Sequence, residues 1–195
     1  MDYANYVKGK YMQMALKGKR LPFGEEWESA IIATQCIFTV NSSMNNNALK
    51  LLQGIPDAFM EDFSNGKPVA YNETTRRCLE SFLRAQNYMN AISLFTFTNI
   101  PPLLRIILEN KDKIDPAIYK YFVGNKAAVE KYAGMCAEQS QAITNSINAS
   151  LRANKKEIEE LKMELAPILD STQTDLNNLM KRFVYALNLQ NVIKV

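Results

Sequence analysis

Apolar residues recur at helical spacing along most of the chain, and only the short segment 93–98 alternates as a strand would. The clearest stripe lies near the C-terminus, where Ile158, Leu161, Leu165 and Ile168 follow steps of three and four with charged residues between them. Such a seam is typical of coiled-coil-like packing. We therefore predict an all-α fold, a multi-helix bundle with a long C-terminal helical hairpin.

Turn and capping residues divide this pattern into two parts. We predict an N-terminal helical body over 1–123 and a C-terminal helical hairpin over 124–195, packed as one unit. Gly124 is expected to end a helix that begins at the cap Asp115. Asn72 is expected to cap a long helix that reaches about residue 98.

Three further helix boundaries are expected from local signals. A helix that begins at Glu25 is expected to end near Val40, where a run of serine and asparagine follows. Pro101 is expected to begin a new helix, because proline suits the first helical turn. Asp170 and Gln173 form a capping-box pattern, which predicts the start of the last helix.

Composition places the chain among folded globular proteins. Its 195 residues are 47% hydrophobic and carry a net charge of +3, which excludes general disorder. Seven glycines and seven prolines are too few for the turns of an all-β fold. Three cysteines imply no disulfide framework, and we expect no signal peptide or transmembrane segment. The expected location is the cytoplasm or a particle assembled inside the cell.

The absence of histidine limits the chemistry that this chain can perform. Without histidine, a Ser-His-Asp triad, a Cys-His pair and mixed Cys/His zinc sites are excluded. No two glycines have the spacing of a phosphate-binding loop. We therefore predict no catalytic residue, no metal ligand, no cofactor and no small-molecule substrate, and we expect that the chain is not an enzyme.

One segment of the predicted C-terminal hairpin has the character of a protein interface. No charge occurs from Gln139 to Leu151, whereas surface helices normally carry lysine and glutamate. Amide and hydroxyl side chains allow close helix approach and hydrogen bonds between subunits, although a half-exposed helix without charges is an equal alternative. The predicted interface residues are Gln139, Gln141, Thr144, Asn145 and Asn148.

The N-terminal twenty residues interleave aromatic and cationic side chains. This combination is typical of surfaces that bind single-stranded nucleic acid or another anionic partner. A helix with a packed tyrosine face and a solvated basic face is the more ordinary interpretation, because the whole chain is nearly neutral. The candidate anion-contacting residues are Tyr6, Lys8, Lys10, Tyr11, Lys17, Lys19 and Arg20.

The region 92–108 contains two apolar stretches around Pro101-Pro102. Two core helices that meet at a corner are the favoured interpretation, because Arg105 and the nearby asparagines are costly in lipid. The alternative is a hairpin that inserts into a bilayer when released, as in helical pore-forming toxins.

Together, these sequence patterns favour a protein that binds other molecules over one that catalyses a reaction. The leading hypothesis is a non-enzymatic interaction or assembly protein that is a subunit of a larger complex or particle, of which a viral or phage structural component is one version. Its partner would be another protein or a second copy. The first alternative is a membrane-acting helical protein that exposes 92–108, and the second is a nucleic-acid binder; neither a membrane nor a nucleic acid is the favoured partner.

Overall fold

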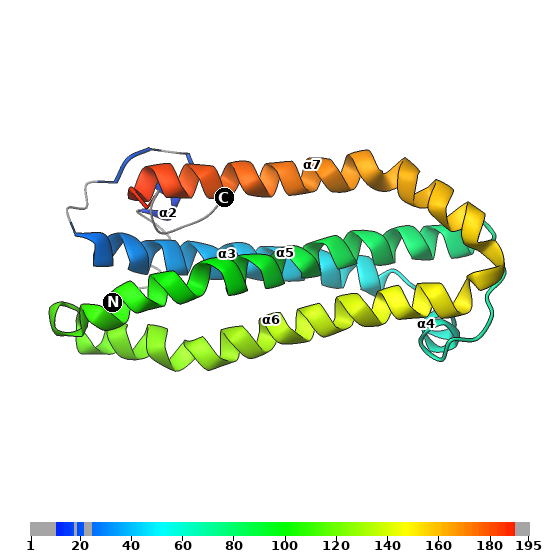
Figure 1. Cartoon of the computed structure of the whole chain (residues 1–195), viewed down its shortest axis with the longest axis horizontal. Helices are drawn as coiled ribbons and strands as arrows, with labels where there is room; N and C mark the ends of the chain where they lie inside the picture. The colour runs from blue at the N-terminus through cyan, green and yellow to red at the C-terminus, as the bar shows by residue number, and fades with distance from the viewer. Residues whose placement is uncertain (1–10, 18, 22–24, 190–195) are drawn as a thin grey trace. The chain divides into compact units, whose positions relative to one another are not determined.

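The computed structural model describes residues 11–17, 19–21 and 25–189. Within these ranges the chain forms α-helices, two short 3-10 helices and no strand (Figure 1). The helices pack against one another, so the predicted all-α bundle is confirmed.

Four of the helices are long. The α-helices are α2 (Met12–Leu16), α3 (Glu26–Gln53), α4 (Asp57–Ser64), α5 (Glu73–Glu109), α6 (Pro116–Ser150) and α7 (Lys155–Leu187). The 3-10 helix η1 (Lys111–Lys113) joins α5 to α6, and η2 (Arg152–Asn154) joins α6 to α7.

The contacts divide the chain into two compact units. Unit 1 takes its described residues from Met1–Ser42, Leu94–Ala133 and Thr174–Val195. Unit 2 is formed by Ser43–Ser93 and Gly134–Gln173. Each of the helices α3, α5, α6 and α7 contributes residues to both units. The division into 1–123 and 124–195 stays a prediction.

The core of unit 1 is built around the first half of α3. Every residue from Ser29 to Ile37 is buried, which explains why this stretch has no charge. The ring of Phe38 lies 6.4 Å from that of Phe122 on α6, centroid to centroid. A buried polar contact joins α3 to α5, since Asn41 Nδ2 donates to Thr96 Oγ1 at 2.9 Å.

The core of unit 2 combines an aromatic cluster with a polar helix contact. Phe63 of α4 stacks on Phe82 of α5 at a centroid distance of 4.6 Å. Further along α5, Gln86 Nε2 donates to the backbone oxygen of Ser140 at 2.8 Å and to Thr144 Oγ1 at 2.7 Å. These bonds fix α5 against α6 in this unit.

Two predicted helix starts are confirmed by their caps. The backbone N–H of Thr75 donates to Asn72 Oδ1 at 3.0 Å, at the start of α5. The backbone N–H of Ala117 donates to Asp115 Oδ1 at 2.9 Å, at the start of α6. Each cap satisfies an N–H that has no partner within the helix.

The predicted break at Pro101 is wrong. Helix α5 continues for 37 residues and contains both Pro101 and Pro102. A proline inside a helix removes one backbone hydrogen bond and costs about 3 kcal/mol. Ile100 before the prolines and Leu103 after them are fully buried, and this packing holds the helix together.

The other expected boundaries are also wrong. Helix α3 passes Val40 and ends at Gln53, α6 passes Gly124, and α7 passes Asp170 without a break. Helix-interior glycine or asparagine costs about 1 kcal/mol or less, which the burial of one helix side outweighs. Capping residues therefore occur inside these helices as ordinary helical positions.

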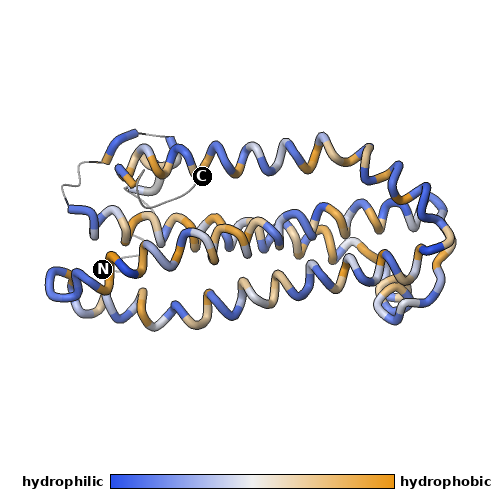
Figure 2. Tube along the Cα trace, in the orientation of Figure 1, coloured by the Kyte–Doolittle hydropathy of each residue, from blue (hydrophilic) through white to orange (hydrophobic). Residues whose placement is uncertain are grey.

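The stripe near the C-terminus is confirmed in part. Ile158, Leu161 and Leu165 are buried in unit 2, but Ile168 is 44% exposed. Hydrophilic and hydrophobic positions alternate from turn to turn along α7 (Figure 2). In this unit Arg76 of α5 forms an ion pair with Glu164 of α7. The coiled-coil-like packing of α6 against α7 stays a prediction.

Replacing either of two glycines by alanine should change the free energy of unfolding, in opposite directions for the two positions. Gly66 has a φ of +67° and ends α4 in a Schellman motif, in which Lys67 N–H donates to the oxygen of Asp62. Gly134 lies inside α6, and a Cβ there would meet nothing within 4 Å. We expect Gly66→Ala to lower the free energy of unfolding by about 1–2 kcal/mol, and Gly134→Ala to raise it by about 0.5–1 kcal/mol. Urea unfolding of the full chain measures both, and a loss of stability in Gly134→Ala would contradict the structure of α6.

Candidate interaction surfaces

The predicted interface on α6 lies in unit 2 and is largely exposed. Gln139, Gln141, Asn145 and Asn148 are exposed, and Gln141 Nε2 donates to Asn145 Oδ1 at 3.0 Å along the helix. Thr144 is half-buried and points to α5, because its Oγ1 accepts the bond from Gln86. The structure therefore brings Gln141, Asn145 and Asn148 onto one helix side, and these three residues are called the α6 amide face.

The predicted basic site is only partly described. Tyr6, Lys8 and Lys10 lie outside the described residues. The remaining members are half-buried Tyr11 and exposed Lys17, Lys19 and Arg20. The Arg20 guanidinium lies 5.6 Å from the ring centroid of Tyr185 on α7, so this cation stacks on an aromatic ring of its own unit.

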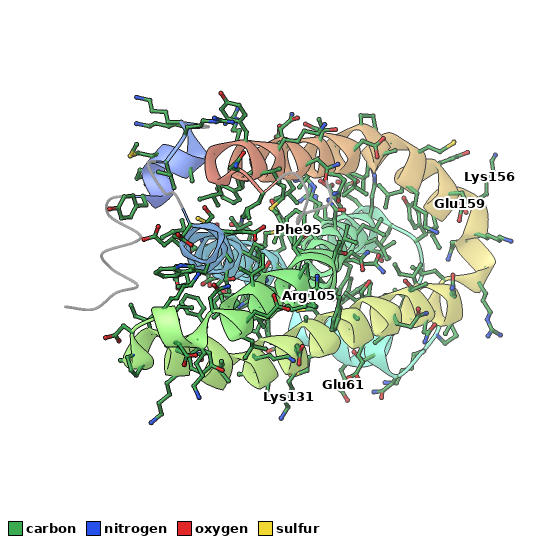
Figure 3. All side chains as sticks on the ribbon, turned by 60° about the vertical axis from the view of Figure 1, so that its left-hand side comes forward. Glu61, Phe95, Arg105, Lys131, Lys156 and Glu159 are labelled. Carbon is green, nitrogen blue, oxygen red and sulfur yellow. The ribbon has the colours of Figure 1, made fainter. Side chains whose placement is uncertain are left out.

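An exposed helix side lies on α5 in unit 1, within the region 92–108 that the sequence analysis considered only as a whole. We call it the α5 outer face; its residues are Leu94, Phe97, Pro101, Arg105 and Leu108. Steps of three and four place these residues on one helix side over about 21 Å. All five are exposed, with exposed fractions of 54% for Leu94, 52% for Phe97 and 44% for Leu108. Figure 3 labels Arg105 on this face and the buried Phe95 of the same helix.

The sequence pattern hides this face because the segment 92–108 is apolar on both sides. Ile92, Ile100 and Ile107 belong to the core, whereas Leu94 and Phe97 do not. The sequence did contain a signal for this face. A helix that packs into the core on one side needs apolar residues on that side only, and the segment 92–108 has them on two sides. The expected break at Pro101 obscured that signal, since a broken helix has no continuous side.

Helix α5 is also the one described helix that is long and apolar enough to cross a membrane. Its 18-residue apolar window is 56% buried inside the protein. A core helix of a soluble protein meets the same length and hydropathy criteria, so this property gives only weak support to a membrane role.

Burial limits the reactivity of two cysteine thiols among the described residues. Burial raises the pKa of the Cys36 thiol to about 12 and also raises that of Cys78. Both thiols therefore stay protonated at neutral pH, and the thiolate is the nucleophilic form. Among the residues that the structure describes, no group of three Cys, Asp or Glu side chains is placed to hold a metal ion.

Unit 1 contains buried amide oxygens without donors. Gln35 Oε1, Asn41 Oδ1 and Asn99 Oδ1 are buried and have no hydrogen-bond partner among the described residues. Only hydrogen-bond donors, such as water, can satisfy these atoms. A buried acceptor without a donor costs about 1–3 kcal/mol, so these positions are a polar defect in an otherwise apolar core.

Comparisons with protein-family models, with curated proteins and with solved structures find no match for this chain. The surfaces described above include an apolar helix face on α5 and an amide-rich helix face on α6.

The buried oxygen of Asn99 gives a test of the unit 1 core. Asn99→Leu replaces an unsatisfied acceptor by an apolar side chain of similar size, so we expect a rise of about 1–2 kcal/mol in unfolding free energy. Asn41→Leu is the matched control, because it also breaks the bond to Thr96 and should not stabilise. Denaturant unfolding monitored by circular dichroism compares the two. Destabilisation of Asn99→Leu by 1 kcal/mol or more would show that Asn99 makes a bond that stabilises the fold.

Proposed function

We propose that this chain is a non-enzymatic assembly protein that associates with a second copy of itself through the α5 outer face. The observation that carries the proposal is the exposure of Leu94, Phe97 and Leu108 on one side of one helix. Single exposed apolar residues are normal, but several large ones on one side of a helix are typical of an interaction surface.

The order of residues on this face suits two copies related by a two-fold axis. Leu94 and Leu108 lie seven residues on either side of Pro101, and Phe97 and Arg105 lie four residues on either side. An antiparallel pairing centred on Pro101 places Leu94 against Leu108 of the partner subunit. The same pairing places Arg105 against the ring of the partner subunit's Phe97, a favourable cation–π contact. Such self-complementarity is the requirement for an isologous dimer.

The size of the face sets the expected affinity. A stable interface buries about 800 Å² on each partner, and one helix side about 21 Å long provides less. We therefore expect association that depends on protein concentration. The α6 amide face is a second surface, in the other unit, through which dimers would join a larger complex or particle.

Light scattering after size-exclusion chromatography tests the proposal. The mass of the full chain is expected to rise from monomer towards dimer with concentration, and Phe97→Asp to remain monomeric at a concentration at least tenfold higher. A buried carboxylate in an apolar contact is costly, which is the reason for this loss.

Met163→Asp is the matched control for this substitution. Met163 is 70% exposed on α7 in unit 2, so the same change of charge there should leave association unchanged. A monomer at all concentrations, without a partner in pull-downs, would refute the proposal. Equal losses in both variants would show that net charge, and not the α5 outer face, controls association.

A second candidate function is membrane permeabilisation by exposure of 92–108, because this region belongs to the one described helix with sufficient length and hydropathy to cross a bilayer. Arg105 in this region is costly in the bilayer centre, which makes this function the weaker candidate.

Vesicle leakage separates the two candidates. If the protein acts on membranes, it should release dye from vesicles that contain phosphatidylserine, and Phe97→Asp should reduce the release at least tenfold. If association through α5 is the function, we expect no release. Absence of leakage between pH 5 and pH 8 would exclude the membrane function.

A further inference from the structure

Unit 2 contains a cleft of about 320 Å³ that belongs to neither surface described above. Its walls come from three helices, with Lys50 on α3, Arg84 and Tyr88 on α5, and Ile168 and Leu169 on α7. The volume falls at the lower end of the range of about 300–1,000 Å³ for small-molecule sites.

The polar wall of the cleft carries an excess of positive charge. Lys50 is exposed and forms no ion pair within the described part of the chain. Arg84 is paired with Glu80 through one nitrogen, since its Nη2 lies 2.7 Å from Glu80 Oε1. With Glu80 neutralising one of the two cations, about one positive charge remains on this wall.

The Arg84 side chain can face a ligand with part of its guanidinium group. The side chain is 36% exposed, and the guanidinium group has only hydrogen-bond donors. Its Nε is buried without a partner among the described residues, so contact with a ligand would use the other nitrogens. An oxyanion in the cleft would complement the positive charge of this group.

The part of the cleft lined by α7 includes an apolar residue that the packing leaves uncovered. Ile168 is 44% exposed, although the helical stripe of α7 predicts burial. Leu169 lies beside it on the cleft surface, and the half-buried ring of Tyr88 faces the same space. An apolar ligand group in this cleft would cover Ile168 and contact the tyrosine ring.

We propose that the cleft binds a small organic anion in which a carboxylate, sulfonate or phosphate group is joined to an apolar body. Lys50 and Arg84 hold the oxyanion, and Ile168, Leu169 and Tyr88 hold the apolar body. The site is independent of the α5 outer face, because all of its lining residues belong to unit 2.

The probe for this test is 8-anilinonaphthalene-1-sulfonate, which combines one sulfonate with an aromatic body. Fluorescence titration of the full chain is expected to show saturable binding of one probe per chain. The double variant Lys50→Gln with Arg84→Gln should weaken binding at least tenfold. Raising the salt concentration should also weaken binding to the native protein, because the charge contribution is screened.

A matched control exists on the same helix. Arg77 pairs with Glu73 four residues before it, as Arg84 pairs with Glu80, but Arg77 does not line the cleft. Arg77→Gln should therefore leave binding unchanged. The uncharged analogue N-phenyl-1-naphthylamine should bind more weakly, and its binding should not change in the double variant. Phe97→Asp should also retain binding, which excludes the α5 outer face as the binding surface.

Circular dichroism and thermal unfolding establish that the variants are folded, and Arg84→Lys, which keeps the charge, should bind with intermediate affinity. Absence of saturable binding, or binding that is equally strong in the double variant, would overturn the proposal. Equal weakening in Arg77→Gln would also overturn it, since a general loss of positive charge would then explain the effect.

Discussion

The continuity of α5 through Pro101 and Pro102 is the constraint on which the other features depend. Two prolines inside a helix cost about 3 kcal/mol each. Ile100, Leu103, Leu104 and Ile107 are buried around them, and each contributes about 1.5–3 kcal/mol. The contribution of this burial equals or exceeds the cost of the two prolines, so the helix persists because its inner side is packed. An unbroken helix aligns Leu94, Phe97 and Leu108 on its outer side, whereas a broken one would point them in different directions.

The same helix has a different role in each unit. In unit 1 it provides core contacts on one side and an apolar surface on the other. In unit 2 it provides Gln86 to the contact with α6 and Arg84 to the cleft wall. The proposed contact with a second copy and the proposed binding of a small anion therefore use separate residues of one element. A change at Phe97 should leave the cleft intact, and a change at Arg84 should leave the apolar face intact.

The features that the sequence predicted correctly are those that depend on residues close together in the chain. The caps Asn72 and Asp115 were predictable because a side-chain oxygen next to a helix start satisfies its free N–H groups wherever the helix lies. The helix end expected at Gly124 and the helix start expected at Pro101 were wrong, because packing against residues distant in sequence outweighs a local preference of a few kcal/mol. The cleft could not be predicted, since Lys50, Arg84 and Ile168 are brought together only by the fold. The interface on α6, expected from its lack of charge, stays a prediction, and the partner of Thr144 on α5 was not visible in the sequence.

Site-specific photo-crosslinking tests the proposed contact through the outer side of α5, with p-benzoylphenylalanine placed at position 97 in one protein and at position 163 in another. We expect a crosslinked dimer from position 97, with the crosslink mapped near Arg105 of the partner subunit, and none from position 163. Equal crosslinking from both positions, or crosslinks from position 97 that map away from α5, would contradict it.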